Sequence, residues 1–214
     1  MKQGTGDKKL DILLDGGLDQ KSNILVVSPP GEIKKTFALQ FMREGLSIGQ
    51  TGIIIDYDTP IADIERFFSG ASNPPLIIDG YSWTLGSESR SRYNVQGPTA
   101  LNDLSILLSH ILEKSPGPKR VVFNSLSTLL LYNDPDTIYK FTQIIGARLK
   151  NSDATALFLL ESGMHSDASV TTIEHIMDDI ITFKYAGKSW KMRIRSMGDN
   201  PITVEESVEG VRIP

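Results

Sequence analysis

The sequence contains no cysteine among its 214 residues, which excludes disulfide frameworks, zinc–thiolate sites, iron–sulfur clusters and cysteine nucleophiles. It has only three histidines, His110, His165 and His175, and their scattered positions lack the spacing of a metal site. It also lacks an apolar run near the roughly 20 residues that span a bilayer, and Met1–Lys9 has no signal-peptide core. We therefore expect a cytoplasmic protein with no membrane insertion and no bound metal.

Basic residues are slightly fewer than acidic ones, with 22 Lys and Arg against 26 Asp and Glu, so the net charge is −4. A pI near 5.4 argues against bulk attraction to nucleic acid or anionic lipid. The 18 glycines and 11 prolines are too few for a low-complexity chain. The length suits one domain, and we expect residues 1–214 to form a single domain with a sizeable core.

Short apolar runs rich in β-branched residues alternate with helical segments along most of the chain. The runs predict strands at Asn23–Val27, Gly52–Tyr57, Pro75–Ile78, Arg120–Phe123 and Thr155–Leu160. The segments between them predict helices at Lys35–Ser47, Ile61–Phe68, Leu101–Lys114, Asp136–Lys150 and Thr171–Met177. Alternation of this kind gives right-handed β–α–β units and a parallel sheet that helices cover on both faces.

After Asp179 the pattern changes to short strands joined by Gly, Asn and Pro turns. These strands are expected at Ile180–Tyr185, Ser189–Arg195, Ile202–Glu205 and Gly210–Ile213, and they predict an antiparallel extension. The expected fold is α/β with three layers, a mainly parallel central sheet and antiparallel strands at its C-terminal edge. Gly86–Gly97, rich in Ser and Arg, is predicted to be the longest loop.

The segment Val26–Phe41 carries the most functional information. A strand, a turn, a lysine and an amphipathic helix follow one another there, as in the phosphate-binding P-loop G-x-x-x-x-G-K-[ST]. Lys34 matches the lysine of the motif. Ser28 and Ile33 stand at its two glycine positions, and Lys35 stands where a hydroxyl would bind magnesium. By the motif alone, an ordinary strand–helix turn is the better interpretation.

A register shifted by one residue makes Lys35-Thr36 the Lys-Thr pair, but it puts Pro29 and Lys34 at the glycine positions. The first register is favoured by a family resemblance. Pro30-Gly31, Lys34 and Phe37–Phe41 resemble the loop of the KaiC/RadA branch of the RecA-like ATPases, which commonly reads Gly-x-Pro-Gly-x-Gly-Lys-Thr-x-Phe-Ala-x-Gln-Phe.

Further segments resemble the same family in the same order along nearly the whole chain. They are Leu10–Leu18 before the first strand, Ile77–Ser82 in the middle, Arg120–Ser127 as the Walker B strand, Gly163–His165 with Thr172–Ile176, and Met192–Met197 as the closing strand. The resemblance implies a three-layer RecA-like P-loop fold and protein partners or self-association. It also implies a nucleotide site at Pro30, Gly31, Glu32, Ile33, Lys34, Lys35 and Thr36.

The phosphate loop departs from the family pattern. In a working site, backbone N–H groups of a Gly-rich loop surround the phosphates at a helix N-terminus. Ile33 is β-branched and resists the backbone conformations that glycine permits, and Pro29 has no N–H to donate. Glu32 adds a carboxylate where phosphate charge would lie, although Lys34 and Lys35 offset it.

Other parts of the expected nucleotide site also depart from the family pattern. The Walker B strand ends in Asn124, where the family has the Asp that holds magnesium. Asp58 stands alone where the family has an acidic pair; it is the candidate catalytic residue, with a strand-end cap as the alternative role. Arg195 lies one residue before the place of the family's Lys-x-Arg pair. The resemblance therefore implies at most weak binding of ATP or ADP, and these losses argue against a magnesium site.

One basic cluster lies on the predicted closing strand. Lys191, Arg193 and Arg195 alternate with apolar residues, so a strand there has one apolar and one basic face. A solvated strand face, a subunit interface and a nucleic-acid footprint are the three interpretations, in order of decreasing weight. The acidic pI disfavours nucleic acid as a partner.

Three functional classes follow from this sequence. The first is a catalytically silent RecA-fold protein that serves in regulation or assembly, with residual nucleotide binding. The second is a working ATPase with an atypical loop, and the third is an accessory protein of DNA recombination. The losses at the phosphate site favour the first class over the second, and the negative net charge disfavours the third.

Overall fold

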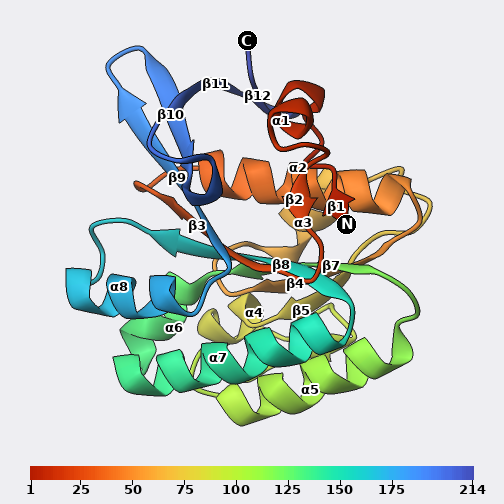
Figure 1. The fold of residues 1–214 in the computed structure, drawn as a ribbon. Coiled ribbons are helices and arrows are strands. Elements are labelled where there is room, and N and C mark those ends of the chain that lie inside the picture. The colour runs from red at the N-terminus through yellow and green to blue at the C-terminus, as the bar shows by residue number, and fades with distance from the viewer.

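The computed structural model describes all residues from Met1 to Pro214, and a ten-stranded sheet runs through its middle (Figure 1). The strands of this sheet are β3 (Asn23–Ser28), β4 (Thr51–Asp56), β5 (Leu76–Asp79), β6 (Tyr93–Asn94), β7 (Lys119–Asn124), β8 (Ala154–Glu161), β9 (Asp179–Ala186), β10 (Ser189–Ile194), β11 (Ile202–Ser207) and β12 (Gly210–Arg212). Their order is β12-β11-β10-β9-β3-β8-β7-β4-β5-β6. A separate antiparallel pair joins β1 (Lys2–Gln3) to β2 (Leu18–Asp19).

The central sheet is parallel from β9 to β6 and antiparallel beyond β9, which confirms the expected mixed sheet. One detail of the prediction is wrong. The segment Ile180–Tyr185 was expected to belong to the antiparallel extension, but β9 pairs parallel with β3 and antiparallel only with β10. β9 is parallel to β8 because α8 (Asp167–His175) carries the chain back to the end of the sheet where β8 begins, as in a β–α–β unit.

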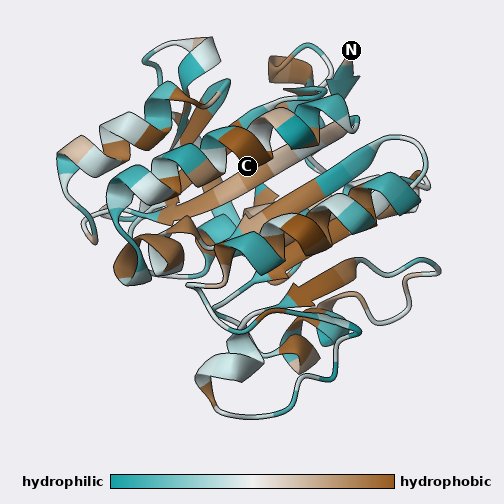
Figure 2. Ribbon diagram, turned by 90° about the horizontal axis from the view of Figure 1, so that it is seen from below, coloured by the Kyte–Doolittle hydropathy of each residue, from teal (hydrophilic) through white to brown (hydrophobic).

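Helices cover both faces of the sheet. On one face lie α1 (Lys8–Leu13), α2 (Ile33–Ser47) and α3 (Ile61–Phe67), and on the other lie α5 (Leu101–Lys114), α6 (Leu126–Tyr132), α7 (Pro135–Asn151) and α8 (Asp167–His175). The short helix α4 (Tyr81–Thr84) follows β5. Figure 2 shows hydrophobic strands beneath amphipathic helices. None of the helices combines the length and the apolar character that a membrane crossing requires.

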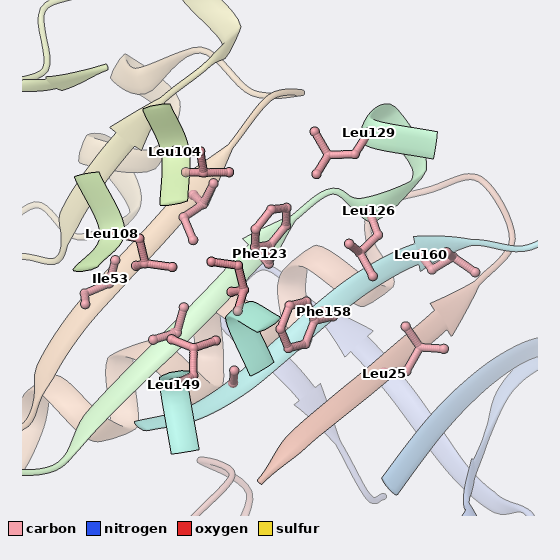
Figure 3. Packing of buried hydrophobic residues seen from close by; sticks show 14 of the residues in the cluster. Leu25, Ile53, Leu104, Leu108, Phe123, Leu126, Leu129, Leu149, Phe158 and Leu160 are labelled. Carbon is pink, nitrogen blue, oxygen red and sulfur yellow. The ribbon is translucent and has the colours of Figure 1, made fainter. Parts of the chain in front are cut away.

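Alternate residues of each buried strand enter two separate apolar clusters, one on each face. In β3, for example, Leu25 belongs to the cluster on the side of α5–α8, whereas Val26 belongs to the cluster on the side of α2. Figure 3 shows the first cluster, in which Phe123 of β7 stacks on Phe158 of β8 with ring centroids 5.6 Å apart. Burial on both faces explains why these strands are continuously apolar in sequence.

The boundaries of the long elements agree with prediction to within one or two residues, except at α8. That helix begins at Asp167, because the Ser166 hydroxyl accepts a hydrogen bond from the Ser169 N–H and caps it. Three short helices were not predicted. They are α4, and α1 and α6, which Asp7 and Ser125 cap in the same way. The predicted loop Gly86–Gly97 contains the two-residue strand β6.

The fully buried Arg120 of β7 ties the N-terminal segment to the sheet and to α2. Its Nη1 donates to the carbonyls of Gly4 (2.7 Å) and Phe41 (2.6 Å), and its Nε donates to Oε1 of Gln50 (2.7 Å). Gly45 makes room for this side chain, because a Cβ there would lie 2.3 Å from Arg120 Cδ. Burial lowers the pKa of Arg120 to about 10, so the guanidinium stays charged at neutral pH.

We predict that Arg120→Met lowers the free energy of unfolding by about 2–4 kcal/mol, because buried carbonyls lose their donor. Urea unfolding of the full chain measures this change. The control is Arg66→Met on α3, whose exposed ion pair with Asp63 (3.0 Å) should be worth less than about 1 kcal/mol. Equal effects of the two substitutions would contradict the structural role of Arg120.

Candidate functional site

The parallel strands present polar side chains at a single edge of the sheet. Ser28, Asp56, Asp79, Asn124 and Glu161 are the last residues of β3, β4, β5, β7 and β8. Ligands of open α/β sheets bind in the crevice outside the carboxyl ends of the strands. This edge, with the loop that leads into α2, is therefore the candidate site.

The loop between β3 and α2 is short, and its end is buried. Gly31 has a φ of +137°, which glycine adopts readily, and Glu32 precedes the helix without capping it through its side chain. Ile33, at the second glycine position of the motif, is fully buried in the apolar cluster beneath α2. The side chain of Ile33 thus belongs to the core.

Lys34, the motif lysine, is directed inward and not into solvent. Its Nζ lies 3.3 Å from Oε2 of Glu161 and 3.4 Å from the carbonyl oxygen of Gly31. The side chains of Lys34 and Glu161 are only 9% and 22% exposed, so this ion pair is poorly screened by water. The Glu161 N–H in turn donates to the Ser127 hydroxyl (2.7 Å). Lys34 is therefore not a solvated residue of the first helical turn.

The next two polar side chains of α2 also face carboxylates. Lys35 Nζ lies 3.2 Å from Oε2 of Glu32, and the Thr36 hydroxyl donates to Oε1 of Glu206 on β11 (3.1 Å). With Glu161, three carboxylates of this chain surround the first turn of α2. Pro30, which starts the matched Pro-Gly pair, is exposed in the loop before that turn.

Asp56 and Asn124 meet at the ends of neighbouring strands. Asn124 Nδ2 donates to Asp56 Oδ2 (2.8 Å), and the N–H groups of Asp58 and Thr59 donate to Asp56 Oδ1 (2.8 and 2.7 Å). Burial raises the pKa of Asp56 to about 7, and these hydrogen bonds only partly oppose that rise. Asp56 therefore caps the end of β4, because it accepts the backbone hydrogen bonds of the turn that follows.

Asp58, the candidate catalytic carboxylate, has both oxygens engaged by hydroxyl groups. Oδ2 accepts from Ser125 (2.6 Å), and Oδ1 accepts from Thr128 on α6. Ser125 also caps α6, so Asp58 helps to fix the start of that helix. The hydrogen bonds of Asp58 therefore have a structural role at the start of α6.

The basic strand is largely engaged within the chain. Arg193 pairs with Asp199 (2.8 Å), and Lys191 donates to the Thr203 hydroxyl (2.5 Å). Arg195 was expected to continue the basic face, but it lies in a 3₁₀ turn after β10 and donates to the carbonyls of Met177 (2.7 Å) and Asp178 (2.9 Å). Because the Arg195 guanidinium binds backbone carbonyls near the end of α8, it does not continue the basic face of β10.

Comparison with solved structures identifies the class of protein that this fold defines. The whole chain superposes on 99% of a KaiC-like protein from the archaeon Pyrococcus horikoshii, with a TM-score of 0.76 and 17% sequence identity. The fold is therefore that of a KaiC-like RecA-type protein. Residues 22–183 match a family of unknown function, DUF7504, and the chain belongs to that family.

Curated relatives are similar over most of their length. A UPF0273 protein of Pyrobaculum aerophilum is 25% identical over 222 residues, which cover 92% of this chain and 77% of that protein. UPF0273 proteins of Thermotoga maritima and Methanopyrus kandleri are 24% and 21% identical and cover 94% and 98% of this chain, and 92% and 90% of their own lengths. Their names assign no activity.

Glu161 and Glu206 are the residues of this edge that sequence reasoning missed. Glu161 lies 127 residues from Lys34, and Glu206 lies 170 residues from Thr36. The one local signal was the position of Glu161 directly after the predicted strand Thr155–Leu160. Nothing near Glu206 in the sequence indicates that β11 passes the first turn of α2.

The raised pKa of Asp56 predicts a pH dependence. The folded chain holds the Asp56 proton more tightly than the unfolded chain, whose pKa is near 3.8, so this group lowers stability as pH rises from about 4 to 7. Asp56→Asn should remove this contribution, and its stability relative to the wild type should rise across that range. Urea unfolding at each pH measures the difference, which would stay flat if Asp56 titrated normally.

Proposed function

We propose that this protein is a KaiC-like RecA-fold protein with a degenerate nucleotide site, which acts in regulation or assembly and not as an ATPase. One observation carries this proposal: Lys34, Lys35 and the hydroxyl of Thr36 each already have a carboxylate partner within the chain. A bound phosphate would have to displace these partners and lie beside their negative charge. Binding of ATP or ADP is therefore weak.

The residues that remain do not suit a magnesium ion. Lys35 replaces the expected hydroxyl, and Asn124 replaces the expected carboxylate and turns its Nδ2 toward Asp56. The oxygens of Asp56 accept hydrogen bonds from three N–H groups. Phosphoryl transfer depends on positioning and on metal and hydrogen-bond stabilisation of developing charge, and this edge supplies little of either.

The N-terminus of α2 keeps some attraction for an anion. The first N–H groups of a helix have no partner within it, and the helix dipole adds positive potential at that end. Residual nucleotide binding is thus compatible with lost catalysis. An active ATPase with an atypical loop is the alternative, and it requires Lys34 to exchange Glu161 for a phosphate. DNA binding is disfavoured, because Arg193 and Arg195 already have partners within the chain.

We predict no magnesium-dependent phosphate release above the level of the Lys34→Ala variant, because losing a single well-placed donor typically costs about 10²–10³ in rate. Purified wild type and Lys34→Ala are assayed in parallel with ATP, and the variant reports any contaminating ATPase. Magnesium-dependent release by the wild type that Lys34→Ala abolishes would contradict the proposal and favour the active-ATPase alternative.

A further inference from the structure

A cavity of about 370 Å³ lies outside the carboxyl ends of β5 and β6, at one edge of the sheet. Its lining includes Asp79, Trp83, Glu88, Asn94 and Gln96. A cavity of this size can hold a small molecule. The strands β4, β7 and β8 separate β5 from β3, so four strand spacings, or roughly 19 Å, lie between this cavity and the phosphate loop. The two sites are therefore distinct.

Trp83 on α4 forms an aromatic wall of this cavity. A Cβ at Gly97 would lie 2.4, 2.7 and 2.8 Å from three adjacent ring atoms of Trp83, Cε3, Cζ3 and Cδ2. Such similar distances mean that one face of the indole lies flat on the Gly97 backbone. Trp83 is nevertheless 50% exposed, so its exposed surface belongs to the opposite face and to the ring edges. Gly97 does not line the cavity, which borders the uncovered part of the ring.

The two charged side chains of the lining are both acidic. Asp79 is only 2% exposed, and its oxygens accept hydrogen bonds from two backbone N–H groups and from the Ser89 hydroxyl (2.5 Å). Neither Asp79 nor Glu88 takes part in an ion pair of the chain. Arg90 and Arg92, on the same loop, do not line the cavity. The negative charge of this cavity therefore has no cationic partner within the chain.

An open indole beside unpaired carboxylates suits an organic cation. The face of a Trp ring attracts an ammonium group more strongly than that of any other side chain. Two nearby carboxylates add Coulomb attraction for a cation and repel an anion such as phosphate. A neutral apolar ligand would gain the contact with the ring but nothing from the charges. The lining thus selects for positive charge on a ligand with some apolar surface.

We propose that this cavity binds a small, free alkylammonium cation. The cationic head lies over the uncovered face of Trp83, beside the Glu88 carboxylate. Asp79 adds negative potential from the wall but makes no direct contact, because its oxygens already accept hydrogen bonds. The side chains of Asn94 and Gln96 can bond to a hydroxyl group of the ligand. Binding here requires no nucleotide and does not depend on the proposed function.

Choline is the probe, and 3,3-dimethylbutan-1-ol, which has carbon in place of the charged nitrogen, is the matched control ligand. Titration of the full chain at low salt, followed by NMR, should give saturable shifts of the Trp83 indole N–H and of the Gln96 and Gly97 amides with choline. The neutral isostere should bind at least about tenfold more weakly, because it lacks the cation–π and Coulomb attraction.

Two substitutions test the assigned contacts. Trp83→Leu should weaken choline binding about five- to tenfold, and Glu88→Gln about fivefold, with the Gln96 and Gly97 amides as reporters. Tyr185→Leu removes an exposed aromatic ring from β9, and Glu113→Gln removes an exposed carboxylate from α5. Both lie outside the cavity lining and should leave choline binding unchanged.

The proposal is wrong if choline gives no saturable shift at these reporters, or if the neutral isostere binds equally well. It is also wrong if Trp83→Leu and Glu88→Gln bind choline as tightly as the two control variants. Nα-acetyl-trimethyllysine amide distinguishes the source of the cation. Binding of this lysine derivative without binding of choline would contradict a free cation and indicate a lysine side chain of a partner protein.

Discussion

Burial of the parallel strands on both faces is the constraint on which the rest of this structure depends. Polar side chains are costly between the two apolar clusters, and most of those on the parallel strands lie at the strand ends. Asp56, Asn124 and Glu161 therefore gather at the edge where ligands of this fold class bind. Arg120, the one fully buried charge, is accommodated because Gly45 is small and three oxygen atoms accept its hydrogen bonds.

At the candidate phosphate site, carboxylates of the chain itself pair with the side chains that would bind a phosphate. A P-loop attracts phosphate because its lysine, its hydroxyl and its N–H groups need an anion or a metal to satisfy them. Here Glu161 satisfies Lys34, Glu32 satisfies Lys35 and Glu206 accepts from Thr36. The departures seen in sequence at Ile33 and Asn124 agree with this arrangement, because Ile33 fills the core and Asn124 holds Asp56. In the function that we propose, the altered loop, the altered metal position and the carboxylates of the chain itself all act against nucleotide binding.

Most of the fold was predictable from sequence, because continuous apolar strands and amphipathic helices have clear periodicity. The ends of α5 were predicted correctly to the residue, and those of α2 and β3 to within two residues. The helices α1 and α6 were missed, because six or seven residues show little periodicity and their start depends on the caps Asp7 and Ser125. For the candidate site, the sequence predicted the location but not the partners of its side chains. The partners of Lys34 and Thr36 come from β8 and β11, and such distant pairing leaves no local pattern.

The affinity of the candidate phosphate site for ADP tests the central claim most directly. Calorimetric titration with magnesium present compares the wild type with the combined variant Glu32→Gln, Glu161→Gln and Glu206→Gln. Glu205→Gln, on the same strand as Glu206, is the control. Because each neighbouring carboxylate costs a phosphate about 1 kcal/mol even in water, the combined variant should bind ADP at least about tenfold more tightly than the wild type and the control. Tight ADP binding by the wild type, with no gain in the combined variant, would contradict the account.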